Sequence, residues 1–154
     1  MEILFGVVIG VVLFTVLMYL VLMQVRVKQM KQANQLLEEF KEENIVAYTS
    51  AANYIGVESS GYEQVRGNSF LMLTSQFLLL ERLAPRKRLM IPLRKIFRVD
   101  QVASFLGRRN IKPILRVAFT NDEGEQDTLG ILLKDPDKWE QLVHAASGQA
   151  RKFV

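Results

Sequence analysis

The chain contains the sequence PILRVAFTNDEGEQDTLGILLKDPDKWEQLVHAASG at residues 113–148, which carries the clearest signals of secondary structure. In its first part, Leu115, Val117 and Phe119 recur at every second position, which is typical of a β-strand with one buried face. An Asn-Asp-Glu-Gly turn signal and a second apolar run, 125–134, come next. The stretch therefore predicts a β-hairpin.

The end of the same stretch has the features of an amphipathic helix. Asp135 is a favourable N-cap residue, and Pro136 suits the first helical position. Apolar residues then recur at i, i+3, i+4 and i+7, namely Trp139, Leu142, Val143 and Ala146. A single apolar stripe of this kind has to be buried, and we expect Trp139 to be its largest contact with the sheet.

Short apolar runs separated by turn residues also precede the hairpin. Seven strands are predicted in all, at 53–58, 63–74, 77–83, 88–92, 96–105, 113–120 and 125–134. Seven strands followed by one amphipathic helix predict a mainly β domain over residues 45–154. We expect a seven-stranded antiparallel, partly open barrel that is capped by the C-terminal α-helix.

The N-terminal segment has a different composition from the rest of the chain. Residues 3–23 carry no charge, and 18 of these 21 residues are hydrophobic. As a helix the segment is roughly 31 Å long, about the hydrocarbon thickness of a bilayer, so residues 1–23 are predicted to be a transmembrane anchor. The alternative is a cleaved signal peptide, which has a basic start, a shorter apolar core and a small-residue cleavage site. None of these features is present.

The charges around the anchor predict its orientation. Arg26, Lys28 and Lys31 follow the apolar segment, and no Lys or Arg precedes it. The positive-inside rule then keeps the C-terminal domain in the cytoplasm and puts the N-terminus outside. We therefore expect a single-pass protein of the cell (plasma or inner) membrane, in contact with membrane lipid through residues 3–23. Gly6 and Gly10 form a GxxxG spacing, which leaves a homodimer open.

Residues 24–44 are predicted to be a helical juxtamembrane stalk. The segment has no Pro or Gly, and apolar residues recur at steps of three and four amid Lys, Gln and Glu. A solvated single helix and a short parallel coiled coil both fit this pattern, because fewer than three heptads are available.

Three segments resemble the pleckstrin-homology-like superfold. They are GYEQVRGNSFLMLT at 61–74, Ile91-Pro92-Leu93 leading to Ile96, and DPDKW at 135–139. Their order and spacing over roughly residues 50 to 147 are similar to those of a group of uncharacterised bacterial single-pass membrane proteins with a GRAM-type domain. The resemblance implies a module that binds lipid headgroups, peptides or proteins, and implies no catalysis. Phosphoinositide-binding members carry Lys and Arg around the first hairpin, where this chain has only Arg66.

The inventory of reactive side chains also argues against an enzyme. The chain has no cysteine and a single histidine, His144, without the Ser and Asp spacing of a catalytic triad. No glycine-rich phosphate loop is present, and the acidic turn near residue 123 lacks the calcium-loop pattern. We expect no catalytic residue, no cofactor and no metal site.

The distribution of charge is the most informative remaining feature. Residues 82–116 contain 11 basic residues against Asp100 alone, whereas residues 121–141 contain 7 acidic and 2 basic residues. Turns on a rigid scaffold are frequent binding sites. The predicted contact residues are therefore the basic residues of two turns, Arg86, Lys87, Arg88, Arg108, Arg109 and Lys112. The alternative is that these charges lie on several separate solvated faces.

Two functions follow from these features. The first is a membrane-anchored interaction module that binds a protein or peptide partner at the cytoplasmic face of the membrane. The alternative is a sensor of anionic lipid surfaces that uses the basic segment 82–116. Nucleic acid is not an expected partner, because the basic segment lacks an aromatic stacking pattern and belongs to an anchored protein.

Overall fold

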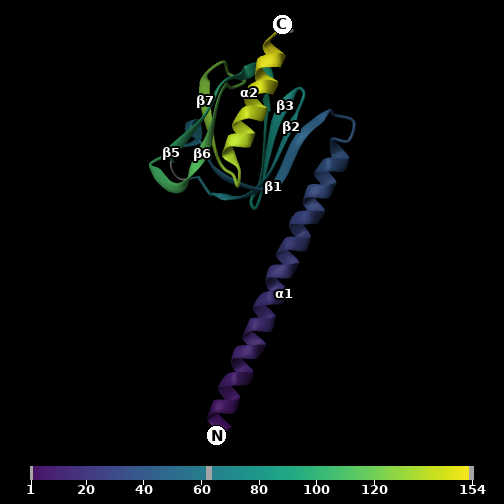
Figure 1. Ribbon diagram of the computed structural model, residues 1–154, viewed down its shortest axis with the longest axis vertical. Coiled ribbons are helices and arrows are strands. Elements are labelled where there is room, and N and C mark those ends of the chain that lie inside the picture. The colour runs from purple at the N-terminus through teal and green to yellow at the C-terminus, as the bar shows by residue number, and fades with distance from the viewer. Residues whose placement is uncertain (1, 62–63, 153–154) are drawn as a thin grey trace. The chain divides into compact units, whose positions relative to one another are not determined.

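The computed structural model describes residues 2–61 and 64–152 and divides into two compact units, residues 1–39 and residues 40–154 (Figure 1). The first unit is the helix α1, Glu2–Glu39. Within it, the Thr15 hydroxyl donates a hydrogen bond of 2.6 Å to the Val11 carbonyl, so this polar group is satisfied inside the helix. Among the described residues, α1 alone is long and apolar enough to cross a membrane. Its length and composition fit a membrane span and also fit a signal sequence.

The helix ends five residues before the end of the predicted stalk. The amide of Glu43 bonds to the carbonyl of Phe40 at 3.0 Å in a turn, and the first strand then begins at Ile45. Residues 24–39 are helical, as predicted, and residues 40–44 lead into the second unit.

The second unit is built on one antiparallel sheet with the order β4-β3-β2-β1-β7-β6-β5. The strands are β1 Ile45–Val57, β2 Gly67–Thr74, β3 Phe77–Leu83, β4 Arg86–Pro92, β5 Ile96–Phe105, β6 Arg108–Thr120 and β7 Gln126–Leu132. Two short 3₁₀ helices, η1 Glu58–Ser60 and η2 Leu93–Lys95, follow β1 and β4. All seven predicted strands are confirmed, and the edge strands β4 and β5 leave the barrel open.

The first strand curves the sheet into a half-barrel. Residues 45–54 of β1 pair with β2, and residues 53–57 pair with β7. Register shifts interrupt both pairings, and such irregularities bend a strand. One strand therefore belongs to both halves of the sheet.

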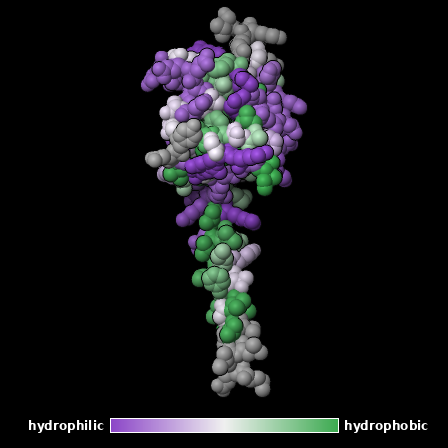
Figure 2. Space-filling model, turned by 90° about the vertical axis from the view of Figure 1, so that its left-hand side faces the viewer, coloured by the Kyte–Doolittle hydropathy of each residue, from purple (hydrophilic) through white to green (hydrophobic). Residues whose placement is uncertain are grey.

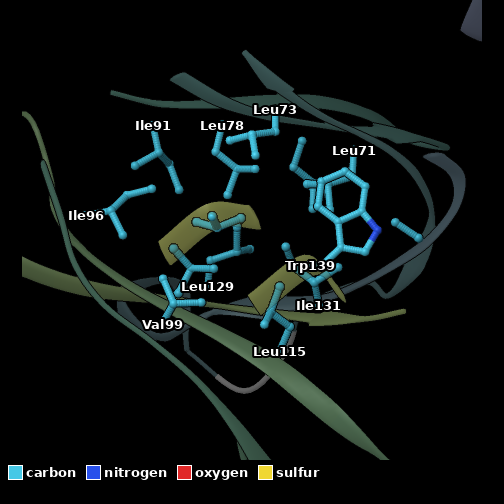
Figure 3. Close-up of a cluster of buried hydrophobic side chains, with 14 of the residues drawn as sticks. Leu71, Leu73, Leu78, Ile91, Ile96, Val99, Leu115, Leu129, Ile131 and Trp139 are labelled. Carbon is cyan, nitrogen blue, oxygen red and sulfur yellow. The ribbon is translucent and has the colours of Figure 1, made fainter. Parts of the chain in front are cut away.

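Apolar side chains from both halves fill the space inside the half-barrel. Figure 3 shows Leu73 and Leu78 of one half pointing toward Leu115 and Leu129 of the other. The helix α2, Pro136–Lys152, lies across the curved sheet and packs against β5, β6 and η2 (Figure 1). Trp139 is buried in the same cluster, so the predicted packing of this side chain against the sheet is confirmed.

Local hydrogen bonds explain where α2 begins. The amide of Lys138 donates to Asp135 Oδ1 at 3.3 Å, which is the expected N-cap interaction. The helix continues past Gly148, although the predicted apolar stripe ends at Ala146.

A smaller apolar cluster lies apart from the main core. It contains Ile55, Phe105 and Ile114, and the Phe105 ring lies directly over Gly130. A Cβ atom at Gly130 would lie 2.7 Å from Phe105 Cε1, so the ring occupies space that only a glycine leaves open.

Candidate functional site

The hairpin of β3 and β4 separates the basic residues of the first predicted turn onto two faces. Its register pairs Leu80 with Leu89 and Arg82 with Lys87. Because side chains alternate along a strand, Arg82 and Lys87 continue the inner, core-facing column of the sheet. Arg86 and Arg88 lie on the outer face, so the three consecutive basic residues do not form one cluster.

The outer pair of arginines is engaged by a buried carboxylate. Glu81, whose side chain is 4% exposed, accepts a 2.6 Å hydrogen bond from Nε of Arg86 and another from Nε of Arg88. The Arg88 guanidinium also lies 5.6 Å from the centre of the Phe40 ring. These two predicted contact residues therefore have a structural role in the hairpin.

On the inner face, Arg82 ties the β3–β4 turn to the loop between β1 and β2. Its Nε donates to the Pro85 carbonyl at 2.8 Å, and its Nη1 donates to the Val65 carbonyl at 2.6 Å. The guanidinium carbon lies 5.5 Å from the centre of the Tyr54 ring, within the range of a cation–π contact. Arg82 is 9% exposed, so this charge is fixed and largely removed from water.

The β1–β2 loop is also held from within, by Gln64. The Gln64 Oε1 atom accepts hydrogen bonds from the Tyr54 hydroxyl and from the Val57 amide, and its Nε2 donates to the carbonyls of Val57 and Gly61. Burial raises the pKa of the Tyr54 hydroxyl, which keeps it a proton donor to Gln64. The loop is therefore a fixed platform where Gln64 holds it.

The second predicted basic turn, the β5–β6 hairpin, lies on the other side of this loop. The Leu106 and Gln64 side chains both approach Gly56, at 2.5 and 3.1 Å from where its Cβ would lie. Burial and, second, repulsion from the nearby Arg108 lower the pKa of Arg66 in the loop. The two basic turns thus flank the β1–β2 loop from opposite sides.

The β5–β6 hairpin also carries a protruding segment. Ser104 pairs with Arg109 and Val102 pairs with Ile114, so residues 110–113 of β6 stand opposite one residue of β5. The bulge exposes Ile111 completely, and Lys112 beside it is exposed as well.

We call the set of cations around the loop the basic rim. It consists of the six predicted contact residues together with Arg66, which are Arg66, Arg86, Lys87, Arg88, Arg108, Arg109 and Lys112. The charge pattern predicted the two turns, but the order of residues in the chain gave no signal that the loop with Arg66 lies between them.

The other basic residues of segment 82–116 do not extend the rim into one patch. Lys95 pairs with Asp122 at 2.6 Å, and Arg98 and Arg116 both pair with Asp100. The hydrogen bond from Arg116 is the main cause that lowers the pKa of Asp100. Figure 2 shows the β5 and β6 side of the second unit as mostly hydrophilic, with small separate apolar areas. Ion pairs therefore divide the basic segment.

A cavity of about 160 Å³ lies next to the rim, at the inner end of the β3–β4 hairpin. Apolar groups of Tyr54, Val57, Leu80 and Leu89 line part of it, and Arg82, Lys87, Ser59, Ser60 and Asp127 supply its polar atoms.

The described residues form no cluster that could hold a metal ion. Residues 2–61 and 64–152 contain no group of three or more His, Asp or Glu side chains placed to hold a metal ion. His144 is exposed on α2, near Asp137 and Glu140.

No protein-family model matches the chain, and no curated protein matches it in sequence. A solved structure of the PDZ-RhoGEF DH/PH domains in complex with activated RhoA is similar, with a TM-score of 0.52 and 14% identity. The fold is pleckstrin-homology-like. The match to PDZ-RhoGEF covers 75% of this chain and 34% of that chain, so the chain spans about a third of the DH/PH fragment.

Two further structures share this pleckstrin-homology-like fold at low identity. The C-terminal domain of an unknown protein from Leishmania infantum matches with a TM-score of 0.51 and 10% identity, over 72% of this chain and 90% of that chain. A chain of the 8S snRNP assembly intermediate matches with a TM-score of 0.51 and 8% identity, over 72% and 84%. At these identities the likeness shows the fold alone.

Proposed function

We propose that the chain is a membrane-anchored interaction module that binds an acidic segment of a partner protein at the cytoplasmic face of the membrane. The observation that carries this proposal is the placement of the two basic turns on opposite sides of the β1–β2 loop. The hydrogen bond from Arg82 to the Val65 carbonyl and the contacts around Gly56 fix that placement. A rigid scaffold that presents several cations attracts acidic partners and speeds their association.

In this proposal α1 is a membrane anchor and the second unit is cytoplasmic. The uncharged segment before Arg26 and the basic residues after it support that topology. The resemblance to bacterial single-pass proteins with a GRAM-type domain is part of the same proposal and rests on the sequence. Catalysis has no part in it.

The length of α1 favours a protein partner over the lipid surface. At 1.5 Å per residue, the segment from Met23 to Glu39 is roughly 24 Å long. The headgroup region is roughly 6 Å thick on each side of a bilayer, and the Debye length at physiological salt is about 8 Å. The attachment point of the second unit is then more than one Debye length beyond the headgroups when the helix stands upright.

The ion pairs of the basic segment argue in the same direction. Among the described residues, at least six of its 11 basic residues have a hydrogen bond or ion pair with a protein oxygen, and these include Arg82, Arg86, Arg88, Lys95, Arg98 and Arg116. The pairs of Lys95, Arg98 and Arg116 lie outside the basic rim, so the basic segment does not present one continuous cationic face to an anionic bilayer.

Crosslinking of the full chain in its native membrane tests the proposal. Two variants change one side of the rim each. The double variant Arg109→Glu with Lys112→Glu reverses charges on the β5–β6 hairpin, and Lys87→Glu reverses one on the β3–β4 hairpin. We expect each to reduce the yield of crosslinked partner at least fivefold, because every reversal replaces attraction by repulsion. The matched control for the double variant, Arg94→Glu with Lys138→Glu, makes the same charge change on η2 and α2, and Lys138→Glu alone is the control for Lys87→Glu. Yields that fall equally in the rim variants and in their controls would overturn the proposal.

The lipid-sensor alternative predicts a different measurement. Hydrogen exchange of the full chain would be compared in nanodiscs of anionic lipid and of phosphatidylcholine. Protection of the amides near Arg109 and Lys112 in anionic nanodiscs alone, lost at high salt, would replace the protein-binding proposal by the lipid one. We expect equal exchange in the two lipids.

A further inference from the structure

The cavity beside the basic rim contains two like charges on directly opposite residues. Arg82 and Lys87 are cross-strand partners on the inner face of the β3–β4 hairpin, and both line the cavity. Like charges at directly opposite positions destabilise a sheet unless something compensates them. The pair thus marks a place where an anion would stabilise the fold.

Protein groups hold Arg82 in position without neutralising it. Its two hydrogen bonds go to the uncharged carbonyls of Pro85 and Val65, and its third contact is the Tyr54 ring. Within the part of the chain that the structure describes, none of the ion pairs includes Arg82. A buried cation with neutral partners is costly unless a negative charge can approach it.

Among the described residues that line the cavity, Asp127 is the one carboxylate, and its oxygens already accept hydrogen bonds. Asp127 Oδ1 accepts from the amides of Ser59 and Thr128 at 3.0 and 2.8 Å, and Oδ2 accepts from the Ser59 hydroxyl at 2.5 Å. The two donors of Ser59 tie Asp127 to the η1 segment, and the third donor belongs to β7 itself. Within the described lining of the cavity, Arg82 and Lys87 against Asp127 give a sum of one positive charge.

The size of the cavity limits what can enter. A cavity of 150 Å³ holds a molecule as large as benzene, whereas ordinary ligand pockets measure roughly 300–1,000 Å³. At about 160 Å³ the cavity admits a short chain of a few heavy atoms. Leu80 and Leu89 form an apolar wall that suits the methylene groups of such a chain. Arg82 and Lys87 suit a carboxylate at the end of that chain.

We propose that this cavity receives one acidic side chain, Glu or Asp, of the partner protein. This inference rests on the proposed function and names the group that the partner inserts. The carboxylate lies between Arg82 and Lys87, and the methylene groups lie against Leu80 and Leu89. The basic rim attracts the acidic segment, and the cavity fixes one residue of it.

Methyl NMR of the full chain in phosphatidylcholine nanodiscs tests this inference with small probes. N-acetyl-glutamate amide would be titrated against N-acetyl-glutamine amide, its neutral isostere. We expect saturable shifts of the Leu80 and Leu89 methyl groups with the glutamate probe, and at least tenfold weaker binding of the glutamine probe, as for a lost charged hydrogen bond. Equal responses to the two probes would overturn the inference.

Two variants separate the cavity from the rim. Lys87→Gln keeps an exposed polar side chain and is expected to weaken binding of the glutamate probe about tenfold. Lys112→Gln removes the same charge outside the cavity and is expected to change binding less than twofold. Equal effects of the two would show general electrostatic attraction and would overturn the inference, as would inositol trisphosphate shifting these methyl groups at lower concentration than the glutamate probe.

The two proposals fail in different ways. If the rim variants lose crosslinking but the glutamate probe does not shift the Leu80 and Leu89 methyl groups, the interaction module stands and the site for an acidic side chain is wrong. A glutamate titration that depends on Lys87, with crosslinking unchanged in every rim variant, would retain the site and remove the rim as the partner surface.

Discussion

Replacing Glu81 by Gln is expected to destabilise the second unit by about 2 kcal/mol. The Arg86 side chain is 68% exposed, so its bond to Glu81 is of the surface kind and contributes about 0.2–1 kcal/mol. The Arg88 side chain is 32% exposed, and its charged hydrogen bond contributes about 1–2 kcal/mol after some solvent screening. Gln keeps the volume and one acceptor oxygen but loses the charge that both arginines share.

Thermal unfolding of the full chain in detergent measures this loss. For a domain of about 115 residues, 2 kcal/mol corresponds to a decrease in Tm of about 6–10 °C. Glu123→Gln, in the exposed β6–β7 turn, is the matched control and is expected to change Tm by less than about 2 °C. A decrease no larger than that of the control would refute the reasoning that a buried carboxylate holds the two arginines.

The same substitution separates folding from binding. It removes the negative charge that Arg86 and Arg88 share and so adds one net positive charge to the basic rim. At about 7 Å in water one further charge pair is worth about 0.6 kcal/mol, or roughly threefold in affinity for an acidic partner. We therefore expect a less stable protein that crosslinks its partner better, and reduced crosslinking would contradict the rim proposal.

Three further predictions concern stability. Arg116 lowers the pKa of Asp100 in the folded state, so the Asp100 carboxylate stabilises the fold above the unfolded pKa near 4, and this contribution is lost as the pH falls. Denaturant titrations at pH 6 and pH 3 should therefore show a smaller difference in the free energy of unfolding for Asp100→Asn than for the unmodified chain. Gly130→Ala is expected to destabilise the fold by about 1–3 kcal/mol, because the new methyl group overpacks against Phe105. In a Phe105→Leu background the same change should cost less than half as much, and additive effects would mean that the Phe105 ring does not pack against Gly130. Trp139→Ala is expected to lower the free energy of unfolding by about 3–5 kcal/mol in denaturant titrations. A loss below about 1 kcal/mol would mean that the indole is not packed in the core between α2 and the sheet.

Periodicity predicted the sheet and the final helix well, because buried faces impose it. The strands β3 and β5 have the predicted bounds, and the stripe that includes Trp139 and Val143 is buried. The first strand begins eight residues earlier than predicted, at Ile45. Its first half has one strand neighbour and mostly exposed or half-buried residues, so no apolar run marks it.

The candidate site was harder to predict, because it depends on contacts between distant residues. The basic turns follow from the local charge pattern, but the loop between them is fixed by Gln64 and by the bond from Arg82 to Val65. The carboxylate that holds Arg86 and Arg88 is Glu81, which lies just before the basic segment. A count of charges over residues 82–116 therefore missed the residue that pairs with two of them.

The two-sided pairing of β1 has a mechanical consequence. The chain enters the second unit through residues 40–44 and then this strand, so tension on the N-terminal helix would reach the contact of Phe40 with Arg88 and, next, Ile45. Residues 45–52 are hydrogen bonded to β2 alone, whereas Asn53 and Tyr54 are paired with both β2 and β7. Under load the first half of the strand would therefore detach before the second. Because Asn53 and Tyr54 pair with two strands, they would resist further detachment of β1 and keep the core closed.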